Sequence, residues 1–165
     1  DNGLEDKIEV RLANGLAAFE PVDCISCITI AGMGGRLIAD ILAAGLEKLA
    51  NVSRLVLQPN NREDELRAWL VDHDFRIVDE AILEENEKFY EILVVEHGSQ
   101  ELSAKELRFG PYLMQEQAPA FVQKWSKEVE KLAFALKQLP VENQSARASL
   151  EERIAHIKEV LHVSK

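Results

Sequence analysis

Residues 28–38 read Ile-Thr-Ile-Ala-Gly-Met-Gly-Gly-Arg-Leu-Ile, a β-branched run that ends in glycines and continues with helical spacing. A buried parallel strand that passes into a crossover helix has this pattern. Gly32, Gly34 and Gly35 carry no Cβ atoms that would hold a bound molecule away from the backbone, and they permit positive φ at the turn. We therefore predict that a ligand lies against this loop.

The apolar spacing on both sides of this stretch predicts an α/β fold. The strand before the glycines should cover residues 23–31, and a segment with alternating apolar residues, 7–13, should form another strand. After the glycines, an amphipathic helix should extend to the region of Asn51. A strand at 54–58, a helix capped by Asn61 and two strands at 75–83 and 89–96, joined by an acidic turn at 84–88, should follow. This order predicts a sheet with an antiparallel hairpin at its edge.

A different pattern begins near residue 102. After Pro119, apolar residues recur at spacings of three and four in two stretches, which the polar loop 140–145 separates. Two helices with matching apolar stripes and a short loop are typical of an antiparallel coiled-coil hairpin. We therefore predict two domains, residues 1–101 with the sheet and residues 102–165 with the helices.

Length and charge limit the classes of protein. The 165 residues can form one hydrophobic core, or one core with an appendage. No apolar run reaches membrane-spanning length, and we predict a cytoplasmic protein without membrane contact. The net charge of −10 argues against a protein that coats nucleic acid. Residues 1–102 carry −12 and residues 103–165 carry +2, so a polyanion would be tolerated on the C-terminal part.

Cys24 and Cys27 have the Cys-x-x-Cys spacing of metal and redox sites. A zinc site would need a second pair of cysteine or histidine ligands, and the sequence offers none at a suitable spacing. Within a strand, residues three apart face opposite sides. We therefore predict two buried apolar thiols and no metal site.

The glycine loop does not match the common nucleotide-binding motifs. A dinucleotide fingerprint would have Gly or Ala at the position of Leu37, and the next strand ends in Gln58 where an acid would bind a ribose. The Gly-Lys-Ser/Thr ending of a phosphate loop is also missing from the sequence. An adenosine ligand without phosphates remains, and S-adenosylmethionine is the commonest ligand of this kind.

Several motifs, in order along the chain, resemble one enzyme family. They are Ile30-Ala31-Gly32-Met33-Gly34-Gly35, Leu57-Gln58-Pro59-Asn60, Lys88-Phe89-Tyr90-Glu91, Gly110-Pro111 and the terminal pair of helices. Together they resemble the bacterial tRNA (adenine-N1)-methyltransferases that modify the adenine at position 22.

This resemblance implies a partial class I methyltransferase sheet of Rossmann-like topology, S-adenosylmethionine as cofactor and tRNA as partner. The family begins with a strand that ends in Asp-x-Gly-x-Asp-His and a second strand with an acid for the ribose, and neither matches this sequence. We therefore expect that the chain begins after these two strands and that it is inactive alone.

The resemblance also implies two sets of site residues. The expected cofactor-binding residues are Asn14, Gly15, Leu16, Ala31, Gly32, Met33 and Gly34, where Ala13-Asn14-Gly15 stands for the family's Gly-Asp-Gly. The expected catalytic residues are Gln58, Pro59, Asn60 and Tyr90. Because adenine N1 lies on the Watson–Crick edge, the base would turn out into a pocket, where the amides of Gln58 and Asn60 read it and Tyr90 stacks on it. The alternatives are that Asn60 only caps a helix and that Tyr90 only fills the core.

Three lysines in the C-terminal part are candidate RNA contacts. Lys124, Lys127 and Lys131 lie off the predicted apolar seam, where they could bind tRNA phosphates or simply form a solvated surface. A second functional class also stays open, because the missing cofactor half and the acidic first part would suit a non-catalytic module that binds a partner protein. Another class I methyltransferase that acts on RNA is a further alternative.

Overall fold

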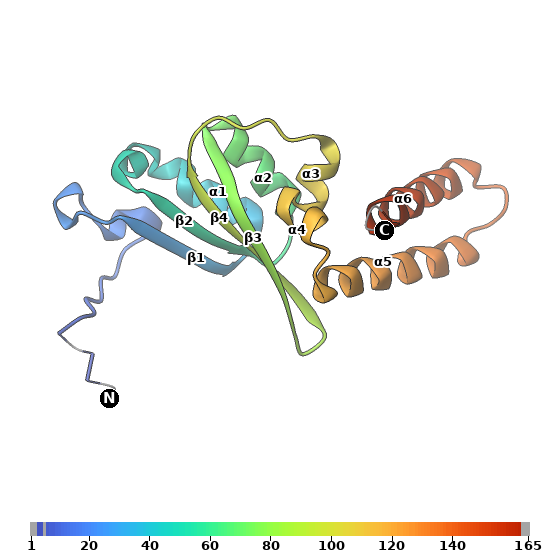
Figure 1. The fold of residues 1–165 in the computed structure, drawn as a ribbon, viewed down its shortest axis with the longest axis horizontal. Coiled ribbons are helices and arrows are strands. Elements are labelled where there is room, and N and C mark those ends of the chain that lie inside the picture. The colour runs from blue at the N-terminus through green and yellow to red at the C-terminus, as the bar shows by residue number, and fades with distance from the viewer. Residues whose placement is uncertain (1–2, 5, 163–165) are drawn as a thin grey trace.

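A computed structural model describes residues 3–4 and 6–162 and contains a mixed four-stranded sheet (Figure 1). The strands lie in the order β1-β2-β4-β3, with β1 parallel to β2 and β4 antiparallel to both of its neighbours. Their bounds are β1 Cys27–Met33, β2 Arg54–Pro59, β3 Phe75–Glu85 and β4 Lys88–His97. The predicted α/β class with an antiparallel hairpin on one side of the sheet is confirmed.

Helices α1 and α2 cover one face of this sheet (Figure 1). Ile38 and Leu42 of α1 and Leu66 and Leu70 of α2 are fully buried against it. In β2, Leu55 and Leu57 are buried while Val56 between them is half-buried, as expected for a strand with one covered face. The helices are α1 Gly35–Ala44, α2 Glu63–Asp72, α3 Ala104–Phe109, α4 Pro111–Glu116, α5 Pro119–Gln138 and α6 Gln144–His162, with 3-10 turns at Gly15–Ala18, Pro21–Asp23 and Leu46–Asn51.

The prediction of a strand at 7–13 is wrong. Residues 8–13 form no regular element, and Val10 and Leu12 are 91% and 105% exposed. Alternation of apolar residues makes a strand only where another strand supplies hydrogen bonds, and none pairs with this segment in the described part of the chain. The guanidinium of Arg11 instead donates to the Asp23 carboxylate at 2.8 Å (Nη2 to Oδ1).

The strand predicted at 23–31 begins later, at Cys27. Pro21–Asp23 form a 3-10 turn, and Cys24 takes the left-handed conformation with φ 51°. Cys24 and Cys27 are both exposed, so the prediction of two buried thiols is wrong. Cys24 lies in the turn before the strand, and Cys27 begins β1, which pairs only with β2 at the edge of the described sheet, where most of its side chains remain accessible.

Three local details also differ from the predictions. The helix expected to reach Asn51 ends at Ala44, and a 3-10 turn follows Gly45. The hairpin turn is two residues long, because Asn86 and Glu87 both take positive φ, which suits the twist of the flanking strands. Asn61 does not cap α2, because Arg62 is the residue before the helix and no side chain caps it.

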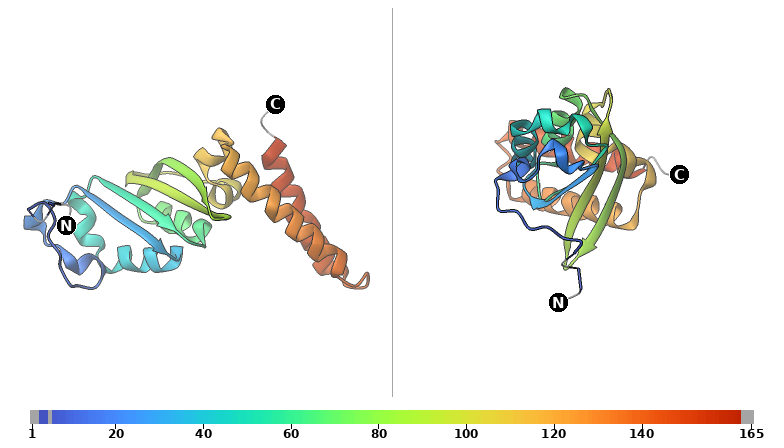
Figure 2. Two further views of the ribbon diagram at one scale, coloured as in Figure 1. Left: turned by 90° about the horizontal axis from the view of Figure 1, so that it is seen from below. Right: turned by 90° about the vertical axis from the view of Figure 1, so that its left-hand side faces the viewer.

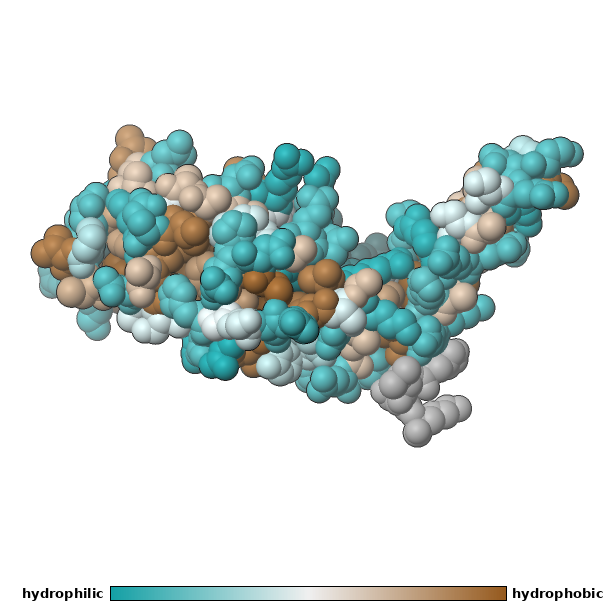
Figure 3. Space-filling model, turned by 90° about the horizontal axis from the view of Figure 1, so that it is seen from above, coloured by the Kyte–Doolittle hydropathy of each residue, from teal (hydrophilic) through white to brown (hydrophobic). Residues whose placement is uncertain are grey.

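Helices α5 and α6 form an antiparallel hairpin that projects away from the sheet (Figure 2). Trp125 and Leu132 of α5 and Ile157 and Val160 of α6 belong to a second cluster of buried apolar side chains. Figure 3 shows a mostly hydrophilic surface over the projecting arm. The coiled-coil geometry and the domain boundary between residues 101 and 102 stay predictions. No helix in the described ranges is long and apolar enough to cross a membrane.

A buried ionic network joins the sheet to the C-terminal helices. The Arg67 side chain of α2 is fully buried, and its guanidinium donates to Glu80 of β3 at 2.8 Å and to Glu91 of β4 at 2.6 Å. The third donation goes to the carbonyl of Leu107 in α3, at 3.1 Å. The other oxygen of Glu80 accepts the backbone N–H of Tyr112, in the first turn of α4, at 3.0 Å. Five elements therefore meet at one guanidinium.

Gly110 and Lys124 complete this network. A Cβ on Gly110, which has φ +84°, would lie 2.6 Å from Glu80 Oε2 and 2.8 Å from Arg67 Nη2, so only glycine fits between α3 and α4. Lys124 Nζ of α5 donates to Glu91 at 2.7 Å and to Glu63 at 3.0 Å. Burial opposes the charge on Lys124, but the two carboxylates outweigh it and raise the pKa of this lysine. Lys124 therefore attaches α5 to the sheet.

We expect Arg67→Met to destabilise the protein by about 3–5 kcal/mol, because it leaves the buried Glu80 carboxylate without a cation and leaves Glu91 with Lys124 alone. Urea unfolding of the purified variant measures this loss. The control is Arg62→Met, which removes an exposed arginine paired with Glu65 just before the same helix and should cost less than about 1 kcal/mol. Equal losses in the two variants would contradict the role given to Arg67.

Candidate functional site

Three segments meet where the parallel strands end: the glycine loop, the end of β2 and the start of β4. Met33 at the end of β1 accepts the backbone N–H of Asn60 at 2.7 Å, which joins the carboxyl ends of the two parallel strands. Because β4 runs antiparallel to β2, its first residues reach the same edge. The pairing of Leu57 with Leu93, continued along the strands, brings Asn60 level with Tyr90.

A cavity of about 660 Å³ opens at this edge. Its size is within the usual range for small-molecule sites. The lining residues are Gly32, Gln58, Asn60, Lys88, Phe89 and Tyr90. The structure thus brings together three of the four expected catalytic residues, whereas Pro59 is buried and does not line the cavity.

Gln58 connects the two loops at the cavity. Its side-chain oxygen accepts the N–H of Gly32 at 2.9 Å, and its side-chain nitrogen donates to the carbonyl of Pro59 at 2.8 Å and to Asn60 Oδ1 at 3.2 Å. Both ends of the Gln58 amide are therefore used within the protein. Asn60 is exposed, and within the described ranges its Nδ2 makes no hydrogen bond to protein, so it can donate to a ligand.

The glycines of the loop have different reasons to be glycine. Gly32 has φ +77°, and a Cβ there would meet nothing within 4 Å, so its backbone faces open space at the cavity. A Cβ on Gly35 would lie 2.5 Å from the carbonyl oxygen of Arg62, because this glycine packs against the loop before α2. A Cβ on Gly34 would meet only the side chain of Asn61, at 3.0 Å. Close approach of a ligand therefore concerns Gly32 most directly.

The expected cofactor residues are divided among neighbouring hollows. A mostly apolar hollow of about 360 Å³ brings together Gly15, Leu16, Ala31 and Met33. Gly32 lies in the 660 Å³ cavity, and Asn14 lines a third hollow beside α1. Gly34 precedes α1 and lines none of the three.

A side chain from the Leu46–Asn51 turn supports the Gly15–Ala18 turn, which carries Leu16. Lys48 Nζ donates to the carbonyl oxygens of Phe19 at 2.7 Å and of Leu16 at 3.4 Å. This lysine therefore holds one wall of the apolar hollow in place. The residues before that wall, 8–13, form no regular element.

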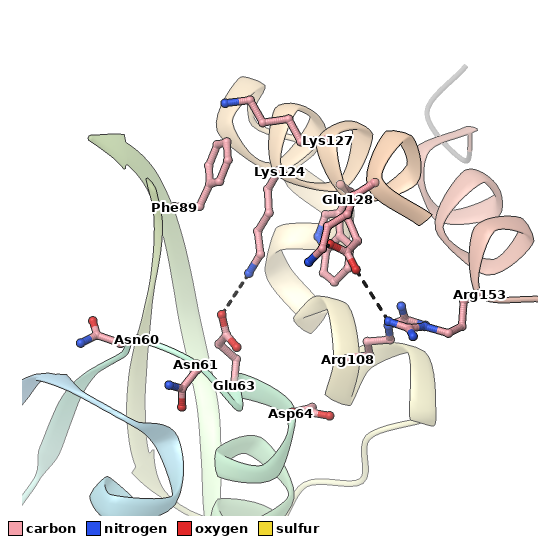
Figure 4. A pocket seen from close by; sticks show the side chains of 12 residues that line it. Asn60, Asn61, Glu63, Asp64, Phe89, Arg108, Lys124, Lys127, Glu128 and Arg153 are labelled. Atoms are coloured by element: carbon pink, nitrogen blue, oxygen red, sulfur yellow. Dashed lines mark hydrogen bonds and ion pairs between the residues drawn. The ribbon is translucent and has the colours of Figure 1, made fainter. Parts of the chain in front are cut away.

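A larger groove of about 680 Å³ lies between the sheet edge and the helical hairpin (Figure 4). All three candidate RNA-binding lysines line it, but in different states. Lys124 forms ion pairs with Glu63 and Glu91. The Nζ atom of Lys127 lies 5.2 Å from the centre of the Phe89 ring. Lys131 forms an ion pair with Glu128 at 3.5 Å. Asn60 and Phe89 line both this groove and the 660 Å³ cavity. The two spaces are therefore contiguous.

Sequence reasoning missed several residues of this site. Lys88 and Phe89 line the cavity, and their place in the Lys88-Phe89-Tyr90-Glu91 motif was the available signal. The burial of Glu91 within the same motif also escaped prediction, since charged residues at a strand start usually face solvent. No cluster of three or more His, Cys, Asp or Glu side chains suited to a metal occurs in residues 3–4 and 6–162.

A Rossmann-like sheet with a glycine turn after one strand, an antiparallel strand (β4) between two strands of the other direction and a cavity at the strand ends defines the methyltransferase class. The model of the tRNA (adenine(22)-N(1))-methyltransferase family matches residues 1–159. The chain belongs to this family.

Similar proteins and solved structures agree with this assignment. The tRNA (adenine(22)-N(1))-methyltransferase of Bacillus subtilis is 38% identical over 172 residues, which cover 97% of this chain and 71% of the relative. Streptococcus pneumoniae Sp1610 in complex with S-adenosyl-L-methionine is 65% identical with a TM-score of 0.88, covering 97% of this chain and 71% of that one. A Streptococcus agalactiae protein of the NADB-Rossmann superfamily is 59% identical with a TM-score of 0.88, covering 96% and 70%.

We expect Gly35→Ala to lower the free energy of unfolding by about 1–3 kcal/mol, because the added methyl group overlaps backbone atoms of the loop before α2. Thermal or urea unfolding checks this value. Gly34→Ala is the matched control, since its methyl group meets only the Asn61 side chain, which can move. If both variants unfold alike, the loop does not depend on the close approach at Gly35.

Proposed function

We propose that the 660 Å³ cavity receives the target base in the S-adenosylmethionine-dependent methylation of N1 of adenine 22 in tRNA, the reaction for which the family is named. The observation that carries this proposal is the hydrogen-bonded series Gly32, Gln58 and Asn60 beside the aromatic side chains of Phe89 and Tyr90. Amides and aromatic rings are the groups that recognise a base turned out of its stack.

Adenine chemistry fits such a cavity without a strong base. N1 of adenine has a free lone pair, so position and exclusion of water supply most of the rate. Asn60 is then the side chain that contacts the base, and Gln58 is a positioning residue, because its own amide is used to hold Asn60 and Gly32. Tyr90, half-buried in β4, forms a stacking wall.

The apolar hollow beside the cavity suits the cofactor. It lies under Ala31 and Met33, next to the open backbone of Gly32, and it offers the apolar contacts that an adenosine ring needs. S-adenosylmethionine supplies the methyl group when it is bound. Gly15 and Leu16 form the other wall, and the exposed Asn14, which lines the adjoining hollow beside α1, supplies the amide oxygen that accepts from the adenine amino group.

Family membership favours an enzyme over a module that only binds a partner protein. The cavity at the strand ends also favours catalysis, because an interaction module would have no need for a concave site that gathers glycine, amide and aromatic groups. A tRNA substrate is consistent with action in the cytoplasm.

We expect Asn60→Ala in the full-length protein to lower kcat/KM for tRNA methylation by about 10- to 100-fold, the loss expected for one hydrogen bond to the base. Transfer of labelled methyl groups to tRNA, with nucleoside analysis for N1-methyladenine, measures it. Asn51→Ala, an exposed asparagine in the turn before β2, is the control and should retain full activity. Unchanged activity of Asn60→Ala would remove this residue from the base site, and wild-type protein that makes no N1-methyladenine would refute the function.

For RNA binding we propose Lys127 and Lys131 and give Lys124 a structural role. The ammonium groups of Lys127 and Lys131 are on exposed side chains at the groove. Lys124 is three-quarters or more buried and already neutralised by two carboxylates, so it has little charge to offer a phosphate. The three lysines should therefore separate in experiments.

We expect the double change Lys127→Ala and Lys131→Ala to raise the Kd for tRNA at low salt and to flatten its salt dependence by about one unit of slope per lost contact. Binding of S-adenosylmethionine should not change. Lys124→Ala should instead lower stability in urea, because it breaks the contact between α5 and Glu91. Filter binding to tRNA and urea unfolding, measured on the same preparations, make the comparison. A loss of tRNA affinity in Lys124→Ala and a loss of stability in the double variant would refute these roles.

A further inference from the structure

Arg108 and Lys127 are the two cations of the groove that have no ion pair within the described residues, and Arg108 is the more buried of the two. It lies in α3, half-buried, with its guanidinium 5.0 Å from the ring centre of Phe109 and 5.6 Å from that of Trp125. Within residues 3–4 and 6–162, no carboxylate lies within ion-pair distance of it. Aromatic stacking fixes the plane of the guanidinium and leaves its N–H groups to other acceptors.

Arg153 of α6 reaches the same part of the groove (Figure 4). Its only described ion pair is a long one, 3.6 Å from Nη2 to Glu128 Oε1. Glu128 also forms an ion pair with Lys131. Burial, with a smaller contribution from the charge of Arg153, lowers the pKa of Arg108. Two guanidinium groups thus face one space that holds too little negative charge for them.

The chemistry of this space suits an anion. Five cationic side chains line the groove against three carboxylates, although the whole chain has a net charge of −10. Of the carboxylates, Glu63 is neutralised by Lys124, Glu128 is shared between Lys131 and Arg153, and Asp64 lies near Arg108 without an ion pair in the described residues. Guanidinium groups favour phosphate, because their planar donors can bind two of its oxygens at once.

The groove also lies where RNA must pass. It shares Asn60 and Phe89 with the 660 Å³ cavity, so a nucleotide whose base enters the cavity leaves its backbone at the groove. We propose that Arg108 and Arg153 together hold one backbone phosphate of a nucleotide next to the target adenine. This assignment rests on the proposed function and names the contact that positions the RNA for it.

The test compares Arg108→Gln and Arg153→Gln in the full-length protein by filter binding to tRNA at several salt concentrations. We expect each change to raise the Kd about tenfold or more at low salt and to reduce the salt slope by about one unit. Affinity for S-adenosylmethionine should stay at the wild-type value. Arg108→Lys should recover only part of the loss, because an ammonium cannot bind two oxygens in the guanidinium geometry.

A modified RNA identifies the anion. Substrates carrying a single neutral methylphosphonate, immediately 5′ or immediately 3′ of the target adenine, should bind wild-type protein more weakly at one of the two positions. At that position, Arg108→Gln should cause no further loss, since the contact is already gone. If the loss caused by Arg108→Gln is the same with every RNA, the arginines do not hold a flanking phosphate and the proposal is overturned.

Three controls separate a specific phosphate contact from a general charge effect, from misfolding and from failure of the proposed function. Lys158→Gln removes an equal charge from α6 at an exposed position outside the groove and should leave tRNA affinity within about twofold of wild type. Arg153 is well exposed, so Arg153→Gln keeps the test valid if Arg108→Gln fails to fold. Wild-type protein that methylates adenine N1, with unchanged tRNA affinity in both arginine variants, would overturn this proposal and leave the proposed function standing.

Discussion

The guanidinium of Arg67, fixed between the carboxylates of Glu80 and Glu91, is the interaction on which the structure depends. It lies where the sheet, helix α2 and the start of the C-terminal helices come together, in a place without solvent. A charge in such a place is stable only when all its donors are satisfied, so its partners must stay in position. Gly110 shows how strict this is, because a single methyl group there would overlap the ionic atoms.

The same ionic network connects the 660 Å³ cavity with the groove beside it. One oxygen of Glu91 binds Arg67 in the core, and the other binds Lys124 at the wall of the groove. Glu91 follows Tyr90 directly in β4, so the strand that lines the cavity also carries the attachment of α5. The 660 Å³ cavity and the groove beside it are therefore built on one continuous piece of protein.

Local patterns predicted much of the fold, whereas long-range pairing decided what they missed. The glycine turn, the hairpin and the two long helices follow from spacing and turn residues, which act within a few positions. Val10 and Leu12 have the pattern of a strand, but a strand needs a partner, and sequence alternation does not report one. Arg67 and Glu80 look like surface charges until the fold brings them together, and the hydrogen bonds that occupy the Gln58 amide also depend on the fold.

The buried attachment of Lys124 has a consequence for selectivity. Lys124 stands only one helical turn before Lys127 and two before Lys131, so the angle at which the α5–α6 hairpin leaves the sheet determines how far these cations lie from the 660 Å³ cavity. A helical hairpin on a flexible hinge could close around many RNA shapes. A hairpin anchored in the protein core instead keeps its lysines at a fixed distance from the cavity. If the proposed lysine and base contacts hold, an RNA must match that separation before its base can enter, which is selection by three-dimensional outline.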